Sequence, residues 1–154
     1  MLVSRKLNVI LSAIIVTAYA HFATSASAQP SNVAAICDSA ATVVSRETGV
    51  PLDVLMAKTR TETGRKSKSG LAPWPWTVNM EGIGKWFDDV SAAQTYVDRH
   101  FARGARSFDG GCFQVNYKWH GQAFGSIEDM FDPILNARYA AGFLSDLYAE
   151  FGNW

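Results

Sequence analysis

The stretch PLDVLMAKTRTETG, residues 51–64, has the pattern of a short amphipathic helix that ends at a carboxyl group. Four of its residues recur at i, i+3, i+4 and i+7 and therefore share one face of a helix, namely Leu52, Leu55, Met56 and Thr59. Glu62 follows three residues after Thr59, so the spacing predicts that it lies on the same face. The Thr-Gly pair that comes next is where the helix is expected to stop.

The predicted position of Glu62 matters for its chemistry. A carboxyl group on the inward face of a helix end is partly desolvated, which raises its pKa and lets it hold a proton near neutral pH. Such a group can serve as a general acid. The alternative interpretation is an ordinary solvated glutamate that closes a helix.

Two further segments accompany this glutamate in a fixed order: GCFQVN at 111–116 and MFDPILNARYAAGFL at 130–144. Together with Glu-Thr-Gly at 62–64, they resemble the motifs of soluble-type (SLT) lytic transglycosylases, which are relatives of goose-type lysozyme. That family has a Glu-Ser-Gly-like motif at a helix end, then a Gly-Leu-Met-Gln-like segment, then a helix that begins Asp-Pro-x-x-Asn. The resemblance extends from Ile36 to Trp154.

The resemblance implies a mostly helical, lysozyme-like α+β domain with a small β-hairpin, acting on the bond between MurNAc and GlcNAc in peptidoglycan. In this family a single glutamate, here Glu62, protonates the leaving sugar oxygen and then takes a proton from the 6-hydroxyl, which leaves a 1,6-anhydro end.

Two alternatives to this function stay open. One is a muramidase-type hydrolase with Asp109 or Glu81 as the second carboxylate, although both residues also suit turns beside glycine. The other is a non-catalytic protein that binds peptidoglycan or assists assembly.

Several further residues are candidates for glycan contacts. The resemblance implies that Gln114 contacts amide and hydroxyl groups of the substrate near the acid; a water-facing glutamine is the alternative. By the same resemblance, Tyr139 is a candidate groove contact and Asn136 an architectural residue. Flat aromatic rings can stack on sugars or fill a core, and Trp76 and Trp86 are the candidates for stacking.

The first 28 residues have the pattern of a secretory signal peptide. Arg5 and Lys6 precede an apolar run at 7–20, and Ala-Ser-Ala at 26–28 fits a cleavage site. The apolar run is short for a membrane span, which needs about 20 residues. The sequence therefore predicts a periplasmic or secreted protein, with an uncleaved membrane anchor as the alternative.

Residues 29–154 are expected to form one domain. Two of the 14 basic side chains and none of the 14 acidic ones lie in the signal segment, so the mature chain is slightly acidic. This charge does not favour nucleic acid or an anionic membrane surface. The expected partners are peptidoglycan glycan strands and an envelope-spanning secretion or assembly complex. No cofactor is expected, and His100 and His120 lack neighbours at metal-ligand spacing.

Cys37 and Cys112 are an even pair in a chain that is predicted to leave the cytoplasm. Such a pair most simply forms one disulfide, which would tie the first helix to the Gly-Cys-Phe-Gln segment. Two buried free thiols are the alternative.

The remaining pattern predicts the other elements. Helices are expected at about 33–48, at about 92–103 with Ser91 as its cap, and from Pro133 onward as the longest helix. A hairpin is expected around Glu81–Gly84, with a flexible link at 66–69 before it and an extended segment at 113–116.

One difference from the family concerns the end of the chain. Related domains continue with a helix whose tyrosine lies beside the catalytic glutamate, whereas this sequence stops at Trp154. We therefore expect a domain truncated at this end. We also expect the apolar stripe at 137–151 to lack part of its covering surface, which would favour self-association.

Overall fold

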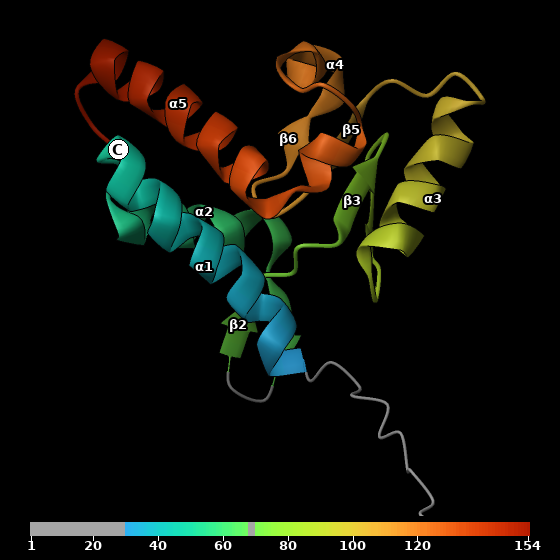
Figure 1. Ribbon diagram of the computed structural model, residues 1–154, viewed down its shortest axis with the longest axis horizontal. Coiled ribbons are helices and arrows are strands. Elements are labelled where there is room, and N and C mark those ends of the chain that lie inside the picture. The colour runs from blue at the N-terminus through green and yellow to red at the C-terminus, as the bar shows by residue number, and fades with distance from the viewer. Residues whose placement is uncertain (1–29, 68–69) are drawn as a thin grey trace, which may run out of the picture.

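The computed structural model describes residues 30–67 and 70–154 (Figure 1). The predicted signal peptide, residues 1–28, lies outside the described residues. None of the helices in the described ranges combines the length and the apolar character that a membrane span requires.

The described residues form an α+β fold that is mostly helical, as the sequence predicts. The α-helices are α1 (Pro30–Thr48), α2 (Leu52–Thr63), α3 (Val90–Phe101), α4 (Tyr117–His120) and α5 (Pro133–Phe151), with 3-10 turns η1 (Gly121–Ala123) and η2 (Glu128–Phe131). The strands are β1 (Arg65–Ser67), β2 (Gly70–Ala72), β3 (Thr77–Met80), β4 (Ile83–Trp86), β5 (Phe108–Gly110) and β6 (Val115–Asn116).

The boundaries of the first two helices follow local backbone chemistry. Helix α1 begins at Pro30, three residues earlier than predicted, and is followed by Gly49, whose φ of +78° suits a residue without a Cβ. Pro51 stands one position before the first helical residue of α2 rather than inside the helix. Its carbonyl accepts a hydrogen bond from the Leu55 N–H at 3.2 Å, so the proline still opens the helix.

The predicted hairpin is present as β3 and β4, but it belongs to a larger sheet. Glu81 and Gly82 form its turn with φ values of +51° and +91°, the left-handed pair that a tight two-residue hairpin requires. The sheet has the antiparallel order β4-β3-β5-β6, so β5 and β6 extend the hairpin on the β3 side. The predicted link at 66–69 is also partly wrong, because Lys66 lies in β1 and pairs with Leu71 of β2.

Helix α3 is capped by a different residue from the one predicted. The Asp89 side chain accepts a hydrogen bond from the Ala92 N–H at 2.8 Å, and Asp89 itself has extended backbone angles. These are the features of an N-cap residue. The helix therefore begins at Val90, two residues before the predicted start, and Ser91 lies inside its first turn.

Helices α1 and α5 lie side by side over α2 (Figure 1), and their contact forms much of the core. Small side chains on both helices allow the close approach: Ala40 and Ala41 on α1 face a region built from Ala137, Ala140 and Ala141 on α5, and all five are buried. The second half of α5 is different, because Tyr148 and Phe151 are exposed. Tyr148 stacks on Trp154 with ring centroids 4.4 Å apart.

The predicted disulfide is confirmed. Cys37 of α1 is bonded to Cys112 across 75 residues of sequence, with Cα atoms 5.5 Å apart. Both cysteines are buried in the core. The bond fixes α1 to the turn that follows β5, which carries the Gly-Cys-Phe-Gln motif.

Candidate functional site

The Gly-Cys-Phe-Gln motif folds as a tight turn, so of the extended segment predicted at 113–116 only Val115 and Asn116 are confirmed, as strand β6. Gly111 begins the turn with a φ of +79°, and the Gln114 N–H donates to the Gly111 carbonyl at 3.2 Å. A Cβ on Gly111 would lie 2.7 Å from the Asn136 side-chain nitrogen, so only glycine fits there. The second motif therefore contacts the third at this turn.

Asn136 is the residue that joins these two motifs, and the prediction of an architectural role is confirmed. It is fully buried on the first turn of α5. Its Oδ1 accepts from the Phe113 N–H at 2.8 Å, while its Nδ2 donates to the carbonyls of Gly110 at 3.1 Å and Met130 at 2.9 Å. One amide side chain thus satisfies three backbone groups around the turn.

Gln114 completes the turn in a conformation that is uncommon for its residue type. Its φ is +47°, in the left-handed region that non-glycine residues rarely adopt. Two hydrogen bonds from Nε2 hold it, to the carbonyls of Thr77 and Gly111, each at 2.9 Å. Both use the amide nitrogen, so the amide oxygen remains the acceptor that Gln114 can offer to a ligand.

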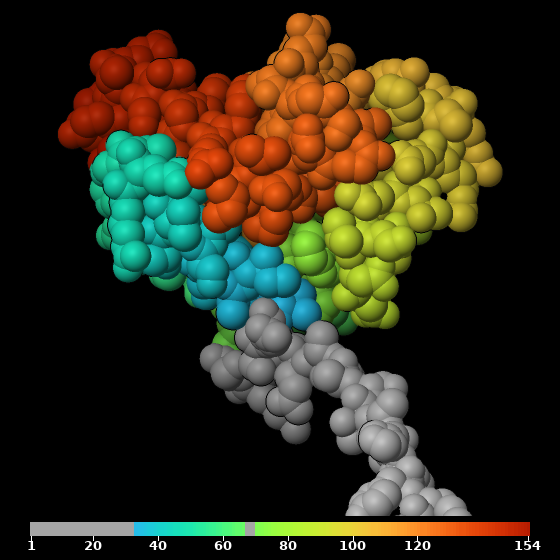
Figure 2. All heavy atoms as spheres, viewed as in Figure 1, coloured from blue at the N-terminus to red at the C-terminus, as the bar shows by residue number. Residues whose placement is uncertain are grey.

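Residues of helix α2 and of the second and third motifs line one pocket of about 160 Å³, and Glu62 is not among the lining residues. Lys58 comes from α2, Gln114 from the turn and Tyr139 from α5. In the space-filling view a notch separates α5 from the segment around α4, the two elements that contribute Tyr139 and His120 to this pocket (Figure 2). The other lining residues are Phe113, Val115, Asn116, His120, Ala140, Phe143 and Leu144.

Glu62 is an exposed residue beside the buried face of α2, so the prediction that it lies on the inward face is wrong. Its side chain is 33% exposed and its carboxylate pairs with the ammonium group of Lys58, one turn earlier in the helix. The buried residues of α2 are Leu55, Thr59 and Thr63, each four residues after the last. Because the buried positions of α2 recur every four residues, Glu62 falls beside them, and the side chain that it contacts is the charged Lys58.

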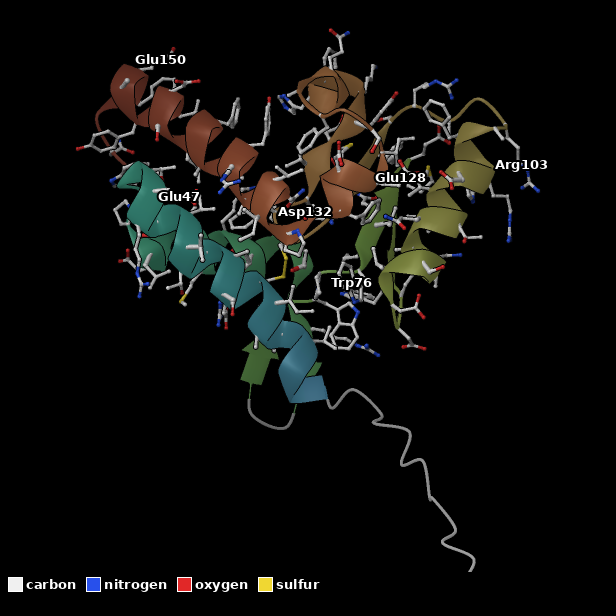
Figure 3. All side chains as sticks on the ribbon, in the orientation of Figure 1. Glu47, Trp76, Arg103, Glu128, Asp132 and Glu150 are labelled. Atoms are coloured by element: carbon white, nitrogen blue, oxygen red, sulfur yellow. A yellow bond between two sulfur atoms is a disulfide. The ribbon has the colours of Figure 1, made fainter. Side chains whose placement is uncertain are left out.

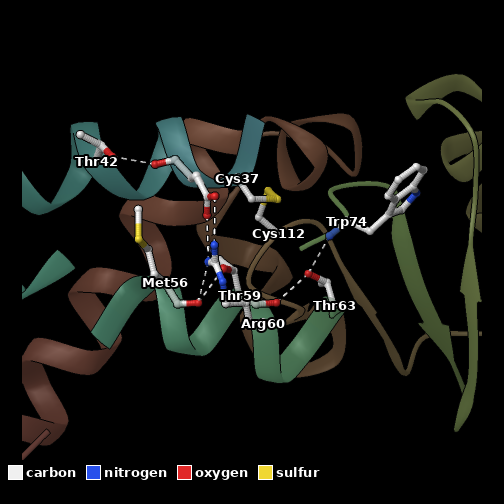
Figure 4. Close-up of polar contacts among 9 residues, drawn as sticks. Cys37, Thr42, Met56, Thr59, Arg60, Thr63, Trp74 and Cys112 are labelled. Atoms are coloured by element: carbon white, nitrogen blue, oxygen red, sulfur yellow. Dashed lines mark hydrogen bonds and ion pairs between the residues drawn. A yellow bond between two sulfur atoms is a disulfide. The ribbon is translucent and has the colours of Figure 1, made fainter. Parts of the chain in front are cut away.

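The end of α2 is fixed by its neighbours, as Figure 4 shows. The Thr63 hydroxyl donates to the Thr59 carbonyl at 2.7 Å and accepts from the Trp74 N–H at 3.1 Å. Arg60 donates two hydrogen bonds to the Asp38 carboxylate on α1, at 2.9 and 3.0 Å. These contacts hold the helix turn that carries Glu62 in one orientation.

The two tryptophans predicted to stack on sugars occupy different places. Trp86 is 49% exposed, and its indole N–H donates to the Thr63 carbonyl at 3.3 Å. Thr63 is the residue that follows Glu62 in the chain. Trp76 packs partly buried against the core, at the end of the molecule opposite α4 (Figure 3). The structure therefore places Trp86 next to the end of α2 and leaves Trp76 apart from the pocket.

Sequence reasoning did not assign a site role to Lys58 or His120. The His120 Nδ1 and the Tyr139 hydroxyl are 2.6 Å apart, and both residues line the pocket. The four-residue spacing between Lys58 and Glu62 is a signal that could have predicted their contact. No comparable spacing links His120 to Tyr139, because they belong to different helices.

The two carboxylates considered as hydrolase partners differ in position. Glu81 is exposed at the tip of the hairpin. Asp109 lies in β5 and accepts a hydrogen bond from Asn116 Nδ2 at 2.7 Å, so it is a strand residue rather than a turn residue. Among the described residues, no three or more histidine, cysteine, aspartate or glutamate side chains gather closely enough to hold a metal ion.

Comparisons of the chain with protein-family models, with curated proteins and with solved structures find no match. The interpretation of the site therefore rests on its motifs and on their geometry.

Proposed function

We propose that this chain is a peptidoglycan lytic transglycosylase that cleaves the β-1,4 bond between MurNAc and GlcNAc and leaves a 1,6-anhydro-MurNAc end. The observation that carries the proposal is that the ion-pair partner of Glu62 lines one pocket together with residues of the second and third motifs. Lys58, which pairs with Glu62, lines it together with Gln114 and Tyr139. These are the regions that the family resemblance assigns to the acid, the substrate amide contact and the groove wall.

In the proposed reaction Glu62 acts twice. Its carboxyl group first gives a proton to the oxygen of the leaving sugar as the glycosidic bond breaks and positive charge develops on the sugar ring. The resulting carboxylate then takes the proton of the 6-hydroxyl, whose oxygen bonds to the anomeric carbon. Lys58 contacts Glu62 and lines the pocket, so it is placed to contact a bound glycan beside the acid.

The proposed substrate contacts use groups that the fold leaves available. The amide oxygen of Gln114 accepts from an acetamido N–H or a sugar hydroxyl, because both hydrogen bonds of its nitrogen go to backbone carbonyls. Tyr139 and His120 form a hydrogen-bonded pair on the opposite wall. Trp86 offers an exposed ring beside the end of α2.

The proposed location is the periplasm or the exterior of the cell. A buried disulfide between Cys37 and Cys112 supports it, since such bonds persist in oxidising compartments. The proposed partner is the glycan strand of peptidoglycan, which an enzyme of this kind would open for an envelope-spanning secretion or assembly complex. The lysozyme-like assignment of the fold is part of the same proposal, supported by a helix whose last turn carries Glu62 and by a small antiparallel sheet.

One observation favours a second candidate, a muramidase-type hydrolase. Asp109 lies on the sheet next to Asn116, which lines the pocket, and could serve as a second carboxylate. The two enzymes give different products from the same bond: the transglycosylase leaves 1,6-anhydro ends, while the hydrolase adds water and leaves reducing ends. A non-catalytic peptidoglycan-binding protein would give neither.

Digestion of purified sacculi followed by mass spectrometry of the released fragments tests the proposal. We expect anhydro-muropeptides from the wild-type protein. Glu62→Gln keeps the shape of the side chain but cannot give and take the proton, so release should fall by at least about 100-fold. Binding to sacculi should persist in this variant.

Glu81→Gln is the matched control, because Glu81 is an exposed glutamate on the hairpin tip. Its activity should equal that of the wild type. Products with reducing ends, together with equal losses in Glu62→Gln and Asp109→Asn, would replace the proposal by the hydrolase. Binding to sacculi without any release from the wild-type protein would replace it by the non-catalytic function.

A further inference from the structure

A second cavity adjoins the candidate pocket at Tyr139, which lines both. It has a volume of about 400 Å³, within the range of about 300–1,000 Å³ that is typical of ligand sites. We call it the α5 cavity. Its lining includes Phe124, Gly125 and Asp129 from the segment before α5, and Leu135, Arg138 and Tyr139 from α5 itself.

Apolar side chains form two sides of the α5 cavity. Leu135 and Tyr139 are four residues apart on α5 and therefore share one face of the helix. The ring of Phe124 packs against that of Tyr139, with centroids 5.4 Å apart. The cavity thus combines apolar sides with a few polar groups, which is the usual composition of a site for a small ligand.

The first charged group of the cavity is the carboxylate of Asp129. This residue is half-buried. Its side chain forms no ion pair and no hydrogen bond with any of the described residues. A Cβ on Gly125 would lie 2.8 Å from Asp129 Oδ2, so the carboxylate lies directly against the backbone of this glycine. Asp129 is therefore held in place at the cavity while its oxygens remain available as acceptors.

The second charged group is the guanidinium of Arg138. Its Nε and Nη2 donate to the Glu47 carboxylate at 2.7 and 2.8 Å, which fixes the orientation of the group. Its Nη1 donates to none of the described residues and can donate to a ligand. Arg138 and Asp129 line the same cavity, yet no ion pair joins them within the described part of the chain.

Two opposite charges that line one cavity without pairing select the kind of ligand. A purely anionic ligand would be repelled by Asp129, and a purely cationic one by Arg138. A metal ion is not favoured, because no cluster of three or more ligating side chains occurs among the described residues. A group that carries both an ammonium and a carboxylate can satisfy both side chains with charge-assisted hydrogen bonds.

We propose that the α5 cavity binds an α-amino acid group with a free ammonium and a free carboxylate. Asp129 accepts from the ammonium, Arg138 donates to the carboxylate, and the aliphatic part of the ligand packs against Phe124 and Leu135. The source that fits an enzyme acting on peptidoglycan is the side-chain end of a diaminopimelate residue in a stem peptide. This choice of source rests on the function proposed above, whereas the chemical class of the ligand does not.

Calorimetric titration with two tripeptides tests the inference. The first is L-Ala-γ-D-Glu-meso-diaminopimelate, whose last side chain ends in an ammonium and a carboxylate. The second is L-Ala-γ-D-Glu-L-Lys, which differs from the first by the loss of that one carboxylate. We expect the first tripeptide to bind with a Kd at least about 10-fold lower, the effect of one hydrogen bond between charged groups.

Two variants assign the charges. Asp129→Asn keeps the shape of the side chain but removes its charge, so the Kd of the diaminopimelate tripeptide should rise by about 10-fold. Arg138→Gln should raise this Kd by a similar factor and should make the two tripeptides bind alike. Glu47→Gln is the matched control, because it breaks the same ion pair but keeps the guanidinium, and its Kd should be unaltered. A merely structural role of Arg138 would give equal losses of affinity in Arg138→Gln and Glu47→Gln.

Equal affinity of the wild-type protein for the two tripeptides overturns the inference, and so does the absence of binding to either one. An unaltered Kd in both Asp129→Asn and Arg138→Gln also overturns it. The tripeptides contain no sugar, and cleavage of sacculi is measured separately, so the two proposals fail independently. Cleavage without tripeptide binding refutes the α5 cavity alone. Selective tripeptide binding by a protein that releases no fragments supports the cavity and refutes the enzymatic function alone.

Discussion

The Oδ1 atom of Asn136 accepts a hydrogen bond from the backbone N–H of Phe113 at 2.8 Å, across 23 residues of sequence. Through this contact the start of α5 determines the shape of the turn that presents Gln114 to the pocket. The disulfide fixes the same turn from the other side, through Cys112. Two independent ties therefore hold the central motif of the candidate site.

Replacement of Asn136 by leucine should destabilise the protein strongly. The change leaves the Phe113 N–H and two backbone carbonyls buried without partners, and each unsatisfied buried group costs about 1–3 kcal/mol. We expect a loss of about 3–5 kcal/mol in the free energy of unfolding, measured by urea denaturation. Asn153→Leu, on an exposed asparagine, should change it by less than about 0.5 kcal/mol. A loss of similar size in both variants would show that the hydrogen bonds of Asn136 do not contribute specially to stability.

The disulfide should contribute to stability in the usual range for small secreted domains. Cys37→Ala combined with Cys112→Ala should lower the free energy of unfolding by about 2–5 kcal/mol, because the bond closes a long loop in the unfolded chain. A reductant should lower the stability of the wild-type protein by a similar amount and should not affect the double variant. Stoichiometric thiol labelling of denatured, unreduced wild-type protein would contradict the bond itself.

The elements that could be predicted from the sequence are those with local signals. Pro133 marks the start of α5 because its missing N–H costs nothing in a first turn. Asp132 before it caps the helix by accepting from the N–H groups of Ile134 and Leu135, at 2.9 and 2.8 Å. The hairpin turn at Glu81 and the end of α2 at Gly64 have equally local causes. The pairing of the two cysteines followed from their number and the predicted export.

The features that escaped prediction depend on contacts between distant segments. Strand β5 is only three residues long, too short for an alternating pattern, and it forms because β3 and β6 pair with it. The same pairing places Asn79, Asp109 and Asn116 opposite one another across the sheet. Glu62 illustrates a different limit, since helical spacing fixes only approximately which face of a helix a residue lies on. Thr59 and Thr63 are the residues that α2 buries, and this packing leaves Glu62 exposed beside them.

An ion pair on the surface should give stability a modest dependence on pH. Arg138 of α5 donates two hydrogen bonds to the Glu47 carboxylate at the end of α1, at 2.7 and 2.8 Å. These hydrogen bonds, with a smaller contribution from charge attraction, lower the pKa of Glu47 below its ordinary value, although desolvation opposes the shift. A lowered pKa in the folded state stabilises the protein above the ordinary glutamate pKa, and this stabilisation is lost as the pH falls through the folded value.

Glu47→Gln should therefore lower the melting temperature slightly at pH 7, and the difference from the wild type should shrink as the pH falls below about 4. The difference at pH 7 should also shrink in 1 M salt, which screens exposed pairs. Glu150→Gln is the control, because Glu150 is exposed on α5. A difference that grows toward acid pH would contradict this account of the pair.

The ring of Trp86 should contribute to glycan binding through its flat face. Its indole N–H donates to the Thr63 carbonyl, and the ring is 49% exposed. Trp86→Ala removes the ring and should raise the Kd for chitotetraose, a β-1,4-linked tetramer of N-acetylglucosamine, about 3- to 10-fold. Calorimetric titration measures this Kd in the Glu62→Gln background, which keeps the ligand intact. Trp86→Phe keeps a flat ring but loses the indole hydrogen bond, so it should retain most of the affinity. Trp119→Ala is the control, since Trp119 is a 72% exposed tryptophan on α4 rather than on strand β4. An equal loss of affinity in Trp119→Ala, or no loss of affinity in Trp86→Ala, would show that Trp86 does not contribute to glycan binding.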